Sequence, residues 1–242
     1  MKFLWFISLL ILVIPSSCVR IKPPDLTRIR EVPESASGKL TRHSGPSWIK
    51  SYFRNDSTNN NHSSSYLFKA SLDIKKHRLS GLLVIKQMDP VSQSNDQDQF
   101  SGPVYRVVFA NEIGMTFFDL EITQKGLRVI NCFKSLNKKA LMKILETDFR
   151  LLTGIDPVKH KKIFRQSFSN NVAISGKTQK YSTWHTFSSK GDTLFKTAGR
   201  STIADPVIIT YENFADASPI KITIENPVIG LKLLLRRLTI QK

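Results

Sequence analysis

Several residue types that perform chemistry in enzymes occur in this sequence, but their spacing does not match the corresponding sites. Gly176-Lys177-Thr178 has the last three residue types of a phosphate-binding loop, yet Asn171 stands where such a loop requires a glycine. No Gly-x-Ser-x-Gly nucleophile elbow surrounds Ser80 or Ser175. The five histidines lack the spacing of zinc ligands; they are His43, His62, His77, His160 and His185. We therefore expect no metal site and no cofactor.

Two carboxylates and one thiol are candidate reactive groups. Asp119 and Glu121 lie two residues apart, so on a strand they share one face and would suit a catalytic pair. Such pairs more commonly form the solvated face of a sheet, and we expect that role here. Cys132 stands alone on an expected strand, which predicts a small buried side chain rather than a nucleophile or a disulfide. The sequence thus predicts a protein that is not an enzyme.

The net charge of +17 indicates anionic partners, and the first residues narrow the choice. Lys2 precedes a predominantly apolar run from Phe3 to Ile14. This run is shorter than the about 20 residues that span a bilayer and has the length of a secretory signal. Pro15-Ser16-Ser17 and Cys18 follow, which also fits an ordinary signal peptide with an incidental cysteine. Secretion leaves a membrane surface or an acidic envelope protein as partner, and we expect no nucleic acid.

The small residues directly before Cys18 resemble the lipobox of bacterial lipoproteins. This resemblance implies a signal peptide at 1–17 and acylation of Cys18, for example with palmitate. Each buried CH₂ of an acyl chain contributes about 0.8 kcal/mol, so several chains anchor firmly. Val19, where an aspartate would retain such a protein at the inner membrane, implies the outer membrane. The lack of acidic residues in 19–24 implies the periplasmic face.

Composition separates a basic flexible tether at 18–65 from one domain at 66–242. Prolines and the Asn/Ser-rich run 55–65 cannot build a core. From residue 68 onward, alternation of apolar and polar residues predicts strands, and Asn111–Gly114 is expected to turn a hairpin. Gly81 predicts a bulge or a close backbone approach. Helical spacing is expected from about 135 to 154, with Arg150 on the solvent side, and a second, very basic segment from 158 to 165.

The expected order is five strands, one or two helices and about six more strands, which predicts a long antiparallel sheet that curls around its helices. This order, the lipoprotein-type start and the segments Ser80–Lys86, Tyr105–Phe109 and Glu112–Asp119 resemble the lipoprotein carrier and receptor superfamily (LolA/LolB-like). They also resemble uncharacterised envelope lipoproteins of the same fold. The resemblance implies an α+β fold: a strongly curved antiparallel half-barrel of about 10–11 strands, with one or two helices covering its concave face.

The resemblance implies that the protein binds a lipid or a lipoprotein acyl chain in an apolar cavity. The candidate lining residues, each of which would equally suit an ordinary core, are Phe68, Leu72, Leu82, Val84, Tyr105, Val107, Phe109, Phe118, Leu120, Leu141, Leu145 and Phe149. In the receptor branch an exposed apolar residue on a hairpin loop enters the membrane, and Ile113 is the candidate here. The alternative is a non-catalytic assembly or scaffold lipoprotein, whose basic face docks an acidic envelope protein or lipopolysaccharide.

Overall fold

The computed structural model describes residues 29–31, 65–75, 77–88, 103–156, 158–166, 171–188, 193–200, 206–215 and 218–238. One helix lies within these ranges, α3 (Lys139–Thr153). The strands are β1 (Ile29–Glu31), β2 (Ser65–Ile74), β3 (His77–Met88), β4 (Val104–Ala110), β5 (Thr116–Ile122), β6 (Leu127–Cys132), β7 (Lys159–Gln166), β8 (Val172–Lys177), β9 (Ser182–Phe187), β10 (Leu194–Arg200), β11 (Val207–Ala215), β12 (Ser218–Asn226) and β13 (Leu231–Arg237).

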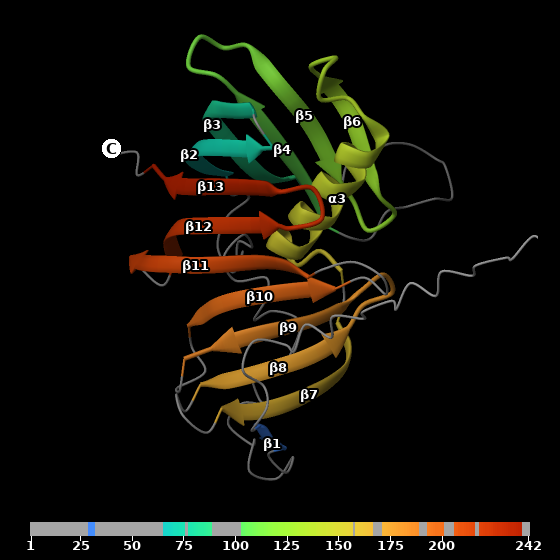
Figure 1. The fold of residues 1–242 in the computed structure, drawn as a ribbon, viewed down its shortest axis with the longest axis vertical. Helices are drawn as coiled ribbons and strands as arrows, with labels where there is room; N and C mark the ends of the chain where they lie inside the picture. Colours follow the sequence, from blue (N-terminus) through green and yellow to red (C-terminus); the bar gives the residue numbers. More distant parts are fainter. Residues whose placement is uncertain are drawn as a thin grey trace, which may run out of the picture.

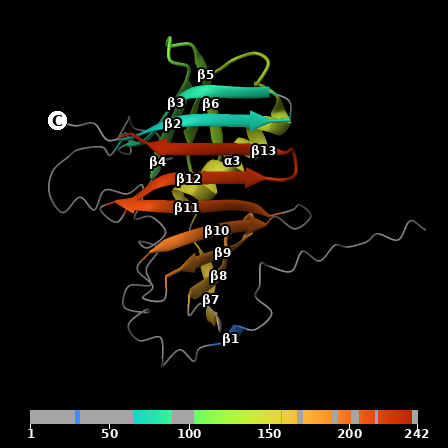
Figure 2. The same cartoon turned by 60° about the vertical axis from the view of Figure 1, so that its left-hand side comes forward.

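All of these strands belong to one 13-stranded sheet with the order β1-β7-β8-β9-β10-β11-β12-β13-β2-β3-β4-β5-β6. Every described neighbouring pair is antiparallel. The sheet is open, because β1 and β6 form its two edges. It is a single layer that twists and curls, and α3 lies on its concave side (Figures 1 and 2).

The expected architecture is therefore confirmed in outline, as a curved, open antiparallel sheet with a helix on its concave face. The structure is mostly sheet and has more strands than the sequence predicted. The basic segment after α3 forms β7, and β1, from within the predicted tether, pairs with it. The signal peptide and Cys18 lie outside the described residues, as does the rest of the predicted tether apart from Ser65, the first residue of β2.

The core begins as rows of apolar side chains that run across the strands. Phe68 on β2 is opposite Leu83 on β3, which is opposite Phe109 on β4, which is opposite Phe118 on β5. Side chains at paired positions point to the same side of a sheet, so these four residues form one row on the concave face. All four are buried. We call them the Phe68–Phe118 row.

Gly81 allows β3 and β4 to come close together. A Cβ at this position would lie 2.0 Å from the carbonyl oxygen of Ala110 and 2.8 Å from the Cα of Asn111. The register between β4 and β5 shifts at Ala110. The close backbone approach that Gly81 predicted is thus confirmed.

The ends of α3 differ in how they are closed. Lys138 occupies the N-cap position, but its side chain makes no capping hydrogen bond. Gly154 ends the helix in the left-handed conformation, with φ 60° and ψ 28°. The buried apolar side chains on α3 include Met142, Leu145 and Leu152. No helix within the described ranges is long and apolar enough to cross a membrane.

Candidate functional site

The concave face beneath α3 is the candidate site, because the helix joins two halves of the sheet there. The Phe149 ring meets Phe118 of β5 edge-on, with centroids 6.1 Å apart. Across the helix, Leu151 packs on Gly199 of β10, where a Cβ would lie 2.5 Å from both Leu151 methyl carbons. α3 is therefore seated by an aromatic contact on β5 and by close packing on a glycine of β10.

Most of the predicted cavity-lining residues lie together in one core. Those that are buried are Phe68, Leu72, Tyr105, Val107, Phe109, Phe118, Leu120, Leu145 and Phe149. Leu141 is partly buried and packs against them. These residues lie close together on the concave side of the sheet. Their part in binding an acyl chain stays a prediction.

Leu82 and Val84 were placed on the wrong face of β3. Leu82 is 37% exposed and Val84 is half-buried on the convex side, while Leu83 and Ile85 face the core. The run from Leu82 to Ile85 is apolar at both odd and even positions, so its own alternation does not select a face. Pairing with β2 and β4 selects it, because Leu83 is opposite the inward-facing Phe68.

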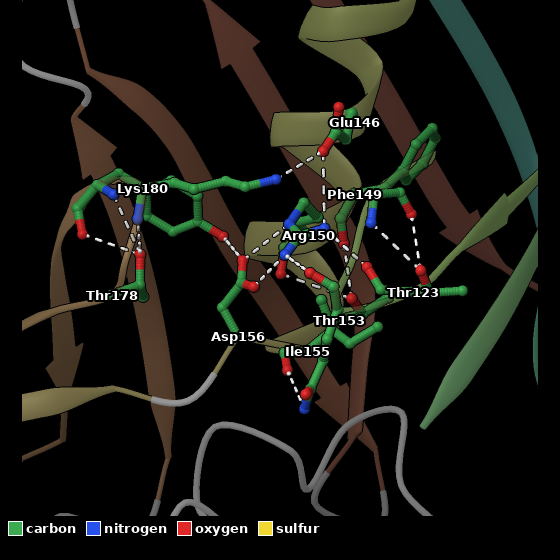
Figure 3. A network of polar contacts seen from close by, with 12 residues as sticks. Thr123, Glu146, Phe149, Arg150, Thr153, Ile155, Asp156, Thr178 and Lys180 are labelled. Atoms are coloured by element: carbon green, nitrogen blue, oxygen red, sulfur yellow. Dashed lines mark hydrogen bonds and ion pairs between the residues drawn. The ribbon is translucent and has the colours of Figure 1, made fainter. Parts of the chain in front are cut away.

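A network of charged and polar groups fixes the C-terminal half of α3, and Arg150 is its centre (Figure 3). Its side chain is only 2% exposed, although the sequence predicted a solvent-facing position. The guanidinium donates to the backbone carbonyls of Thr123, at 2.7 Å, and Gln124, at 2.9 Å. It also donates from Nε to Asp156 at 2.9 Å and forms an ion pair with Glu146 at 3.6 Å. Arg150 thus ties the β5–β6 turn to the helix.

The same network reaches the β8–β9 turn through Tyr181 and Lys180. The Tyr181 hydroxyl donates to Asp156, and Lys180 Nζ lies 3.1 Å from Glu146 (Figure 3). Burial disfavours the Arg150 charge, but hydrogen bonding and attraction from Asp156 more than offset it and raise the pKa of Arg150. Burial, followed by the nearby Asp156 carboxylate, raises the pKa of Tyr181. The charged and polar groups of this network are partners of one another, which indicates a structural role. We call Glu146, Arg150, Asp156, Lys180 and Tyr181 the clamp.

A second polar contact fixes α3 to the sheet from its other side. The Asp148 side chain is 1% exposed and accepts a hydrogen bond from Asn226 Nδ2 of β12 at 2.9 Å. Its second oxygen, Oδ2, is buried and has no hydrogen-bond partner among the residues that the structure describes. Burial raises the pKa of Asp148 to about 7, and the Asn226 hydrogen bond only partly opposes this. A polar residue on the buried face of a helix was not predicted, since its partner lies 78 positions along the chain.

A small cavity lies between the Arg150 network and β9. Its volume is about 20 Å³, room for about one water molecule. The lining residues are Arg150, Leu151, Gly154, Asp156, Val158, Thr178, Tyr181, Thr183 and His185. His185 is buried with Nδ1 3.1 Å from the Thr197 hydroxyl, as expected for a packed histidine. This cavity is far too small for an acyl chain.

The two candidate carboxylates, Asp119 and Glu121, have arginine partners. Asp119 binds Arg106 through two hydrogen bonds, of 2.7 and 3.0 Å. Glu121 binds Arg128 in the same two-pronged manner. The carboxylates therefore form ion pairs on the convex face, as predicted for a solvated side of the sheet. Burial raises the pKa of the Cys132 thiol, which favours the unreactive protonated form.

Exposed apolar side chains lie where β4 and β6 end and β5 begins. Ile113, on the β4–β5 turn, is 89% exposed, and Met115 beside it is exposed as well. Phe133 is also exposed, and its backbone N–H donates to the Phe117 carbonyl at 2.8 Å, next to this turn. We call Ile113, Met115 and Phe133 the apolar tip. Exposed Lys134, which follows Phe133, places a positive charge beside it.

No protein-family model matches the sequence, and no curated protein matches it. Solved structures with a similar fold include a LolA superfamily protein from Nitrosomonas europaea, with 10% identity, a TM-score of 0.49 and coverage of 79% of this chain and 90% of that chain. A DUF1329 family protein from Desulfovibrio piger has 8% identity, a TM-score of 0.47 and coverage of 81% and 91%. A putative outer membrane lipoprotein-sorting protein domain from Vibrio parahaemolyticus has 10% identity, a TM-score of 0.38 and coverage of 84% and 88%. The first of them bears the name of the superfamily that the sequence resembles.

Proposed function

We propose that this chain is an envelope lipoprotein that binds a lipid or lipoprotein acyl chain between α3 and the concave face of its sheet. Acylated Cys18 would hold it at the outer membrane, on the periplasmic side. The observation that carries the proposal is a one-layer curved sheet whose concave face presents continuous apolar rows to a single described helix. Such a surface gains roughly 25 cal/mol for each Å² of an acyl chain that it removes from water.

The attachment of α3 suggests where the acyl chain enters. The polar contacts between the helix and the sheet begin at Glu146 and lie toward its C-terminal end. The N-terminal half, with Leu141 and Leu145, meets the core through apolar contacts and has no side-chain cap. Apolar contacts have no fixed geometry, so this half can exchange its own side chains for an acyl chain while the clamp holds the other half.

We further propose that the apolar tip touches the membrane. Ile113 and Met115 would insert between lipids, with Lys134 beside anionic headgroups. Burying one such apolar side chain contributes about 2 kcal/mol, and a basic residue near an anionic surface about 1 kcal/mol. The tip alone therefore gives weak, reversible contact, which suits a protein that is already anchored nearby.

Lipid extraction tests this function. The full chain carrying Cys18→Ser, which lacks its own acyl chains, is purified and extracted for mass spectrometry. It is then titrated with a fluorescent fatty acid. We expect co-purified acyl lipid and saturable binding that unlabelled palmitate displaces. Absence of both would refute the proposal, and salt-sensitive binding of one acidic protein without lipid would select the scaffold alternative.

A further inference from the structure

Arg237, at the end of β13, lies on the concave side of the sheet although most charged residues lie on the other side. Leu233 and Leu235 are buried, whereas Arg236, the next residue, is exposed. Because side chains alternate along a strand, Arg237 points to the same side of the sheet as the two leucines. Its cross-strand partner on β2 is Phe68, the first residue of the Phe68–Phe118 row. Arg237 therefore stands at the end of this apolar row.

Within the described part of the chain, no carboxylate forms an ion pair with the guanidinium of Arg237, whereas four other arginines each have one. Arg78, Arg106, Arg128 and Arg150 each form an ion pair with a carboxylate. Arg237 is partly buried, and its Nη1 atom is fully buried without a hydrogen-bond partner among the described residues. Burying a charged N–H group without an acceptor costs free energy, and a ligand that supplies an acceptor at this position would remove that cost.

An apolar residue at the start of β12 is exposed on the same face, next to the end of β13. Ile220 precedes Lys221, which is opposite Arg236, and by alternation it lies on the same face of the sheet as Arg237. Ile220 is 40% exposed. The strand ends that carry these residues lie along one edge of the sheet (Figures 1 and 2).

The length of the Phe68–Phe118 row matches that of one acyl chain. Four steps between neighbouring strands, from β13 to β5, span about 19 Å at about 4.8 Å per step. One leaflet of a bilayer has a hydrocarbon thickness of about 15 Å, half of about 30 Å. A tail that reached from Arg237 to Phe118 would therefore lie along the row with its headgroup at the guanidinium.

From this geometry we infer that the ligand is an anionic amphiphile, with a carboxylate or phosphate headgroup bound by Arg237 and a tail along the Phe68–Phe118 row. The inference rests on the proposed function and adds the headgroup chemistry and the orientation. A guanidinium binds both headgroups through paired N–H donors, and bonds of this kind are stronger than those between neutral groups.

The test compares ligands that differ in charge but share a tail. The full chain with Cys18→Ser is titrated with palmitate, methyl palmitate, hexadecyl phosphate and inorganic phosphate. We expect palmitate and hexadecyl phosphate to bind at least about tenfold more tightly than the uncharged ester. Inorganic phosphate should bind at least about tenfold more weakly than hexadecyl phosphate, because it gains nothing from the tail. Phosphate binding as tight as that of hexadecyl phosphate would overturn the amphiphile and leave a free-anion site.

Variants at two neighbouring positions separate a headgroup site from general charge. Arg237→Gln should abolish the preference for the charged ligands, and Arg237→Lys should retain most of it. Arg236→Gln, on the opposite face of the same strand, removes the same charge and should leave the preference intact. If Arg237→Gln keeps the wild-type preference, the inference fails while the proposed function stands. If the wild-type chain binds none of the amphiphiles, the proposed function fails as well.

Discussion

Replacing Asp148 by asparagine should stabilise the protein at pH 8, which is unusual for a change at a residue that is 1% exposed. The carboxyl is buried on α3 with one hydrogen-bond donor, Asn226 Nδ2, and its pKa is raised from 3.8 to about 7. At 1.36 kcal/mol per pKa unit, ionising it in the folded protein costs about 4 kcal/mol more than in the unfolded chain. Asparagine keeps the oxygen that Asn226 binds and removes the charge.

The sign of the effect follows from the two pKa values. Because the folded pKa lies above the unfolded one, the folded state holds its proton more tightly between pH 3.8 and about 7. Stability from this group is complete below pH 3.8, falls as the pH rises toward 7, and stays low above that. The advantage of Asp148→Asn should therefore be about 4 kcal/mol at pH 8 and about 2 kcal/mol at pH 5.

Urea denaturation of both proteins at pH 5 and pH 8 measures this difference. Asp73→Asn is a suitable control, because Asp73 lies in the Arg78 ion pair, which lowers its pKa. Loss of that pair should not stabilise the protein at either pH. If wild type and Asp148→Asn change in parallel between pH 5 and pH 8, the buried, weakly partnered carboxylate is not the cause.

Three further changes test other parts of the structure. Arg150→Met should lower the free energy of unfolding by about 3–5 kcal/mol, since it leaves Asp156 buried without its cation; an effect below about 1 kcal/mol in urea denaturation would contradict the clamp. Gly81→Ala should lower it by about 2 kcal/mol or more, because the new methyl group meets the Ala110 carbonyl, and a wild-type midpoint would contradict the close approach. Ile113→Asp should leave the urea midpoint unchanged, because the side chain is 89% exposed, yet weaken binding of the Cys18→Ser chain to anionic vesicles about tenfold in sedimentation; equal binding would remove the tip from the account.

The parts of this fold that could be predicted from sequence are those where the residues of a single strand or helix show a clear pattern by themselves. Tyr105, Val107 and Phe109 alternate with more polar neighbours, and the inward face of β4 followed directly. Gly154 predicted the end of α3, because glycine readily adopts the left-handed conformation that commonly ends a helix. The face of β3 could not be predicted this way, because Leu82 and Leu83 are equally apolar and the choice depends on pairing with two other strands.

The polar contacts of α3 could not be predicted from local sequence patterns, because most of the partners lie far away along the chain. Arg150 is a typical solvent-facing residue by type. It is buried because its partners come from two other places in the chain, the turn with Thr123 and Gln124 and the segment with Asp156. β7 was missed for a related reason: lysines and arginines dominate its sequence, and its strand conformation comes from pairing with β8.

Cross-linking with a photoactivatable palmitate on the full chain carrying Cys18→Ser tests the central claim most directly. Mass spectrometry of the cross-linked peptides locates the bound tail. Binding beneath α3 predicts cross-links to concave-face residues such as Phe68, Phe118 and Leu145, which excess palmitate suppresses. Cross-links confined to convex-face positions such as Leu82 and Val108, or none that palmitate suppresses, would contradict it.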